Sequence, residues 1–85
     1  MRPTADDFRN ALKAGFAAAQ QGAQNVVDIR SGDLHRQVGA YPAANHRMPV
    51  CCNVMRQEMK GADSILEQPP RGNGANLVIR YYLPR

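Results

Sequence analysis

Apolar residues that recur four positions apart near the start of the chain predict a long amphipathic helix. The large apolar side chains of this stretch are Phe8, Leu12 and Phe16. Positions i, i+4 and i+8 share one face of a helix, so these three are candidate core residues. Thr4 suits the N-cap, Asp7 is placed to complete a capping box, and Gly22 is a typical helix-terminating residue. The sequence therefore predicts a helix from just after Thr4 to near Gly22.

A short strand and a short second helix are expected next. Residues Val26 to Ile29 are rich in β-branched side chains and too few to form a helix. Ser31 can cap a helix over the residues that follow, in which Leu34 and Val38 share a face. Gly39 is expected to end that helix.

A third helix is predicted over about residues 45 to 60. Pro49 suits the first turn of a helix, where its missing N–H would have no partner, and Gly61 is expected to end the helix. Helical spacing places four side chains on the inner face: Met48, Cys52, Met55 and Met59. Val50 and Val54 are then expected on the exposed side of this helix.

The last part of the chain reads as strand, turn and strand. The segment from Leu77 to Leu83 alternates in the manner of a strand with one buried face. The turn sequence PPRGNG, residues 69 to 74, contains glycines that tolerate the positive φ angles of hairpin turns. The sequence therefore predicts a C-terminal hairpin, with Arg80 and Arg85 expected on the outer side of the sheet.

The adjacent pair Cys51-Cys52 is interpreted as part of the core. Neighbouring residues on a helix point about 100° apart, so both thiols cannot readily face one metal ion. The chain has no C-x-x-C motif, and its two histidines are His35 and His46. Zinc sites need four converging ligands, and a vicinal disulfide needs a strained local backbone. We therefore expect two reduced, buried cysteines and neither a metal nor another cofactor.

Length and composition favour one small intracellular domain. The chain has 85 residues, of which 44% are apolar and 21% charged, as in ordinary globular domains. No apolar run is long enough to span a bilayer, and the N-terminus lacks the apolar core of a signal peptide. A single domain over residues 1–85, located in the cytoplasm and not bound to a membrane, is expected.

Sequence features that indicate catalysis are weak. Asp33 and His35 are close in sequence, but no nucleophile is evidently placed to complete a relay. The glycine-containing stretch RGNGAN does not lead into a helix, as a phosphate-binding loop would. We expect the protein not to be an enzyme.

Positive charge is concentrated in the second half of the chain. Residues 1 to 35 contain four basic and four acidic residues, whereas residues 36 to 85 contain seven basic and three acidic ones. The whole net charge of +4 therefore belongs to the second segment. Such a distribution favours a polyanionic partner.

The order helix, short strand, short helix, helix and hairpin resembles a winged helix-turn-helix. The resemblance covers nearly the whole chain and is one of element order, without a diagnostic motif. It implies an α+β fold with three helices, in which the short strand pairs with the C-terminal hairpin, or wing, in a small antiparallel sheet. It also implies that the third helix lies in the major groove of double-stranded DNA, as in a bacterial or phage regulator.

The resemblance and the side-chain chemistry together suggest candidate DNA contacts. Arginine can pair with guanine and asparagine with adenine, while lysine and arginine contact phosphates. A basic wing tip can follow the backbone or enter a minor groove. The candidates are Arg36, Asn45, His46, Arg47, Asn53, Arg56, Gln57, Lys60, Arg71 and Asn73.

The same scaffold also fits a protein-interaction module that never binds DNA. Val50 and Val54, if exposed, favour this alternative, and a net charge of +4 is modest for a DNA-binding protein. DNA-binding winged helices commonly act in pairs, so a homodimer is a third expectation. Ala14 and Ala18, away from the Phe8 face of the first helix, are candidates for its interface.

Overall fold

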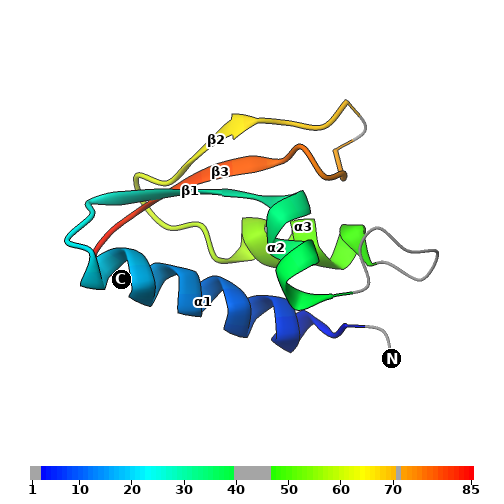
Figure 1. Cartoon of the computed structure of the whole chain (residues 1–85). Helices are drawn as coiled ribbons and strands as arrows, with labels where there is room; N and C mark the ends of the chain where they lie inside the picture. Colours follow the sequence, from blue (N-terminus) through cyan, green and yellow to red (C-terminus); the bar gives the residue numbers. More distant parts are fainter. Residues whose placement is uncertain (1–2, 40–46, 71) are drawn as a thin grey trace.

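The computed structural model describes residues 3–39, 47–70 and 72–85, which form three helices and three strands. The elements in chain order are α1 (Ala5–Gln21), β1 (Val26–Arg30), α2 (Ser31–Val38), α3 (Met48–Gln57), β2 (Ser64–Glu67) and β3 (Val78–Tyr82). The helices gather on one side of the sheet (Figure 1). The predicted α+β class, with three helices and a small antiparallel sheet, is confirmed.

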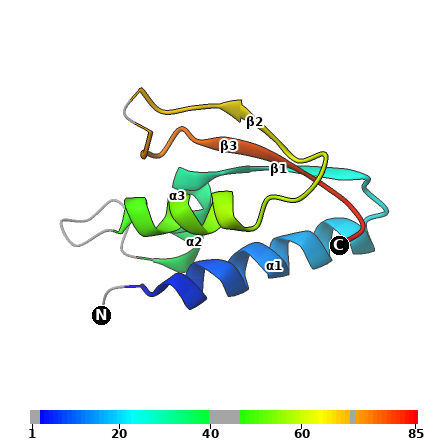
Figure 2. The same cartoon turned by 180° about the vertical axis from the view of Figure 1, so that it is seen from behind.

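The central strand of the sheet is β3. It pairs antiparallel with β1 on one side and β2 on the other, giving the order β1-β3-β2. Val27 lies opposite Tyr81, and Ile65 lies opposite Ile79. The predicted pairing of the short strand with the hairpin is therefore confirmed. Seen from behind, α1 and α3 both lie on the same side of the sheet (Figure 2).

The core is formed where α1, α3 and β3 meet. Phe8, Leu12 and Phe16 of α1 are all buried, as the helical spacing predicted. The ring of Phe16 lies 4.8 Å from that of Tyr81, and the Tyr81 hydroxyl donates to the Met55 carbonyl over 2.8 Å. Tyr81 thus joins β3 to both helices, and burial raises the pKa of its hydroxyl.

The start of α1 follows the sequence prediction closely. The Thr4 side chain accepts from the Asp7 N–H at 3.2 Å, and the Asp7 carboxylate accepts from the Thr4 N–H at 2.8 Å. This reciprocal pair satisfies donors that the first helical turn leaves without partners. The helix ends at Gln21 with Gly22 as its C-cap.

Ser31 does not cap α2, contrary to the prediction. The strand β1 runs directly into the helix, so Arg30 occupies the cap position and Ser31 is the first helical residue. The N–H of Ser31 donates to the Leu77 carbonyl at 2.8 Å, and its hydroxyl donates to the Gly74 carbonyl. Ser31 therefore fixes α2 to the hairpin. Gly39 ends the helix with a φ of 120°, as expected.

The helix α3 is shorter than predicted, because it ends at Gln57 and not at Gly61. The Asp63 carboxylate accepts from the N–H of Lys60 and from that of Tyr82, each at 2.8 Å. These bonds draw the segment after Gln57 into a turn beside β3. Gly61, with a φ of 44°, belongs to this turn.

The inner face of α3 is broader than its sequence spacing suggested. Cys51, Cys52 and Met55 are fully buried, which confirms the interpretation of the cysteines as core residues. Burial raises the pKa of the Cys51 thiol to about 12, and the neighbouring Cys52 adds to this shift. Val54 is only 1% exposed, and Val50 packs partly buried against the core. The expectation that both valines face solvent is therefore wrong.

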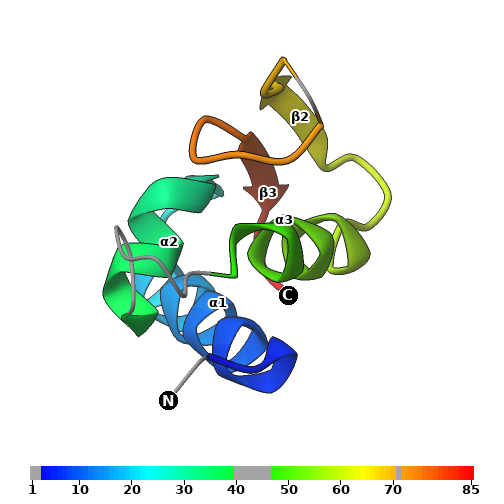
Figure 3. The same ribbon diagram turned by 90° about the vertical axis from the view of Figure 1, so that its right-hand side faces the viewer.

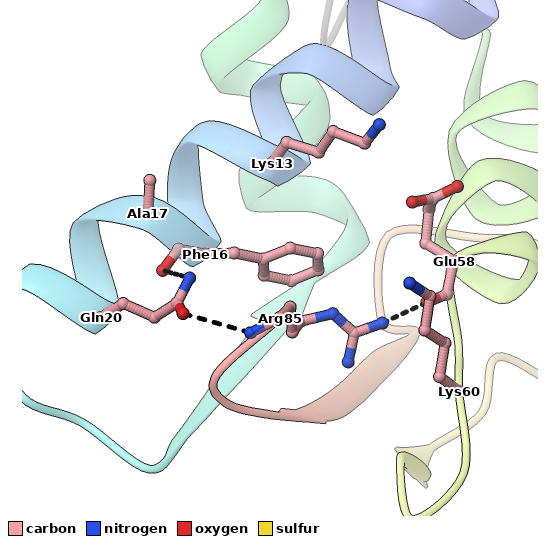
Figure 4. A pocket seen from close by; sticks show the side chains of 7 residues that line it. All are labelled: Lys13, Phe16, Ala17, Gln20, Glu58, Lys60 and Arg85. Carbon is pink, nitrogen blue, oxygen red and sulfur yellow. Dashed lines mark hydrogen bonds between the residues drawn. The ribbon is translucent and has the colours of Figure 1, made fainter.

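Arg80 lies on the outer side of the sheet, as expected, but Arg85 does not. The Arg85 side chain is 9% exposed, and its guanidinium lies 4.7 Å from the centre of the Phe16 ring. It donates to Asp63 Oδ2 at 2.6 Å and to the Glu58 carbonyl, while the Arg85 N–H donates to Gln20 at 3.1 Å. The last residue is thus packed between α1 and the turn after α3 (Figure 4).

Candidate nucleic-acid interface

The exposed side of α3 carries two of the candidate contacts. Asn53 and Gln57 are exposed and four positions apart, so they lie one turn apart along the same face. Arg9 of α1 donates to the Gln57 side chain at 3.4 Å. An amide such as that of Asn53 can both donate to and accept from a base edge. The helix therefore presents a narrow polar strip between α1 and the hairpin.

Arg56, also on α3, reaches the hairpin loop. Its Nη1 donates to Asn73 Oδ1 at 2.9 Å, and its Nη2 donates to the Gly72 carbonyl. Two of the candidate residues, Arg56 and Asn73, are thereby in direct contact. In the view along the helices the hairpin loop lies over α2 and α3 (Figure 3).

Arg47 marks the other end of α3. It is half-buried at the N-cap position, and its Nη1 donates to the Pro3 carbonyl at 3.3 Å. Its backbone N–H donates to Nε2 of the buried His35 at 2.8 Å. Arg47 is therefore held where the starts of α1 and α3 meet.

Lys60 follows α3 and shares a pocket with residues of α1. The pocket has a volume of about 260 Å³ and is lined by Lys13, Phe16, Ala17, Gln20, Glu58, Lys60 and Arg85. In Figure 4 the side chains of Lys13 and Lys60 extend toward it from opposite sides, with the Glu58 carboxylate nearby. Lys13 of α1 and Lys60, which follows α3, thus lie on opposite sides of one pocket.

Of the remaining candidates, only Arg36 lies within the described residues, and it does not add to this surface. Arg36 lies exposed on α2 with its Nη1 3.4 Å from Asp33, so a carboxylate balances its charge. Asn45, His46 and Arg71 lie outside the described residues.

The acidic side chains are nearly all engaged by arginines. Of the seven acidic residues, six form ion pairs, and Asp7 takes part in the capping box. The pairs are Asp6 and Glu58 with Arg9, Asp28 with Arg80, Asp33 with Arg36, Asp63 with Arg85, and Glu67 with Arg30. The Arg80 guanidinium, which contacts both Asp28 oxygens, lowers the pKa of that carboxyl.

Four cations within residues 3–39, 47–70 and 72–85 form no ion pair. They are Lys13, Arg47, Arg56 and Lys60. Arg47 and Arg56 belong to the cap and last turn of α3, Lys60 follows that helix, and Lys13 lies across the pocket from Lys60. The unpaired positive charge is therefore gathered along α3 and its two ends.

Sequence reasoning missed Lys13. It lies in residues 1 to 35, where four basic and four acidic residues balance. Only the folded structure shows that none of these four acidic residues pairs with Lys13. Helical spacing places Lys13 away from the Phe8 face, which predicts an exposed side chain. That spacing does not predict which residues lie beside it.

Comparisons with known proteins leave the family open. No protein-family model, no curated protein and no solved structure matches the chain. Across the part of the chain that the structure describes, no helix is both long and apolar enough to cross a membrane.

Proposed function

We propose that the protein is a winged-helix DNA-binding module, such as a bacterial or phage regulator, which contacts double-stranded DNA through α3 and the hairpin loop. The observation that carries this proposal is the distribution of charge. Carboxylates balance the arginines of the sheet and of α2, while Lys13, Arg47, Arg56 and Lys60 are left without acidic partners around α3. Unpaired cations gathered around one helix suit a phosphate backbone.

The polar strip of α3 supports contact with bases as well as phosphates. Asn53 is exposed between Arg47 and Arg56, and its amide can form a bidentate pair with adenine. The antiparallel sheet order β1-β3-β2 is the order that a winged helix requires, with the hairpin beside the reading helix. These features support the winged-helix assignment and the DNA contact together.

One charge-removing variant at α3 and one matched control on the sheet test the proposal. Lys60→Gln and Arg80→Gln each remove one positive charge, but Lys60 lies beside α3 and Arg80 is paired with Asp28 on the sheet. We expect Lys60→Gln to weaken binding to a random DNA duplex and to reduce its salt dependence by about one phosphate contact. Arg80→Gln should leave the salt dependence unchanged. Equal effects of the two substitutions would show that net charge alone attracts DNA, which would contradict a surface at α3.

The alternative, a protein-interaction module, has lost part of its support. Val54 is buried and Val50 packs partly buried against the core, so the pair of exposed valines that favoured this alternative is absent from α3, while the modest net charge of +4 still favours it. If the protein fails to bind duplex DNA at low salt, a search for protein partners becomes the appropriate next step.

A further inference from the structure

Arg56 directs its guanidinium at the hairpin loop. The two terminal nitrogens donate to acceptors on consecutive residues, namely the Gly72 carbonyl and the Asn73 side chain. A guanidinium carries its donors in a rigid planar fork. Two bonds from it therefore fix both the distance and the orientation of the loop relative to α3. Lysine, with one flexible ammonium, cannot reproduce both contacts in the same geometry.

The residues after the loop tip are fixed to both α2 and α3. The Gly74 carbonyl accepts from the Ser31 hydroxyl and from Cys52 Sγ, the latter at 3.4 Å. The Gly32 N–H donates to the Ala75 carbonyl at 3.0 Å. A Cβ on Gly32 would lie 3.0 Å from Ala75 atoms, so the two backbones touch there. The base of the loop is therefore anchored to the helices without Arg56. The Gly72 N–H donates to the Pro69 carbonyl at 3.1 Å within the loop, and Arg56 supplies bonds that hold residues 72 and 73 against α3.

We infer that Arg56 is a positioning residue, which holds the hairpin tip against α3 so that helix and tip meet nucleic acid as one rigid surface. This inference rests on the proposed function and revises the expectation that Arg56 itself contacts DNA. Because the Asn73 oxygen faces Arg56, its NH₂ group is the end that remains for a partner. An amide donor of this kind suits an acceptor such as a phosphate oxygen.

The test compares Arg56→Lys, which keeps the charge and loses the fork, with Arg56→Gln, which loses both. Each protein is titrated with a labelled random duplex over a range of salt concentrations, and the amide resonances of Gly72 and Asn73 are recorded without DNA. We expect both variants to shift these resonances and to weaken binding about tenfold, because a charged hydrogen-bonded contact is lost. The slope of log affinity against log salt should stay the same, since no phosphate contact is removed.

The opposite pattern would show that Arg56 contacts phosphate directly. Arg56→Lys would then bind nearly as well as the natural protein, and Arg56→Gln would lower the salt slope by about one. Unshifted Gly72 and Asn73 resonances in Arg56→Lys would overturn the positioning role, whatever the affinity for DNA.

If the natural protein binds no duplex, the proposed function fails, and the resonances still decide whether Arg56 holds the tip. Arg80→Lys, which also keeps the charge and loses an arginine fork but lies on the outer side of the sheet, serves as the matched control and should bind duplex with the affinity and salt slope of the natural protein.

Discussion

His35 joins the two ends of the connection between α2 and α3. Its side chain is fully buried, with the ring edge against Phe8 at 4.8 Å between centroids. Nδ1 lies 2.9 Å from the Gly39 carbonyl, and Nε2 accepts from the Arg47 N–H at 2.8 Å. The acceptor role of Nε2 places the ring proton on Nδ1, which donates to Gly39. One neutral ring thus fixes the residue that ends α2 and the residue that precedes α3.

Replacing this ring tests how much the connection contributes to stability. His35→Phe preserves an aromatic ring beside Phe8 but removes both hydrogen bonds and leaves the Arg47 N–H without its acceptor. We expect the free energy of unfolding to fall by about 2 kcal/mol, because an unsatisfied buried donor costs more than an average hydrogen bond contributes. Urea denaturation measures this loss. Gln37→Ala on the exposed face of the same helix should change stability by less than about 0.5 kcal/mol, and an equally small effect of His35→Phe would contradict the role.

At the scale of single residues, local spacing predicted the side chains whose environment depends on their own helix. Phe8 and Cys52 are buried where the helical period placed them. Val54 and Arg85 were misplaced because their surroundings come from elsewhere in the chain. Arg85 is covered by Phe16, which is far away in sequence, and pairs with a buried carboxylate. No pattern within the last residues indicates such a partner.

At the scale of elements, Asp63 joins the turn after α3 to β3 and to Arg85, which follows that strand. Its oxygens accept from the Lys60 N–H after α3, from the Tyr82 N–H of β3, and from the Arg85 guanidinium. Burial acts to raise the pKa of the Asp63 carboxyl, since its side chain is 1% exposed. The hydrogen bonds and the Arg85 charge outweigh burial and lower that pKa overall.

This pKa shift predicts how stability depends on pH. A carboxyl whose pKa is lowered by folding stabilises the protein above its unfolded pKa of about 4, and the contribution is lost as pH falls toward the folded value. We expect Asp63→Asn to cost about 3 kcal/mol at neutral pH, because it leaves Arg85 buried without a counter-charge. The variant should also lose less stability than the natural protein between neutral pH and about pH 3.

Denaturant titrations at several pH values provide the measurement, with Glu67→Gln as the control. Glu67 is exposed and paired with Arg30, so its replacement should leave most of the acid sensitivity in place. An unchanged acid sensitivity in Asp63→Asn would contradict the assignment. Asp28, whose pKa is also lowered, accounts for part of the sensitivity that remains.

Sequence reasoning succeeded for elements whose ends are determined locally. The capping box of Thr4 and Asp7 and the terminating Gly22 defined α1 almost to the residue. It failed at the end of α3, where the deciding contact is made by Asp63 with a strand nearly twenty residues away. It failed at Ser31 because the strand before it leaves no room for a separate cap residue.

At the scale of the whole molecule, folding pairs charges from the two halves of the chain, so the positive surface differs from the basic second half seen in the sequence. Arg80 is balanced by Asp28 and Arg36 by Asp33, both from the first half. Lys13 from the first half instead joins Lys60 at the pocket. The position of α3 in the candidate interface followed from element order, but which cations remain unpaired followed only from the fold.

The most direct test of this charged surface is the affinity of the natural protein for a labelled random DNA duplex, measured by fluorescence anisotropy at several salt concentrations. If Arg47, Lys60 and Lys13 each contact one phosphate, log affinity should fall with log salt with a slope of about −2.5 or steeper. Binding that is tight at low salt and lost steeply as salt rises would support DNA as the partner. Undetectable binding at low salt, where even non-specific attraction to phosphates is strong, would contradict it.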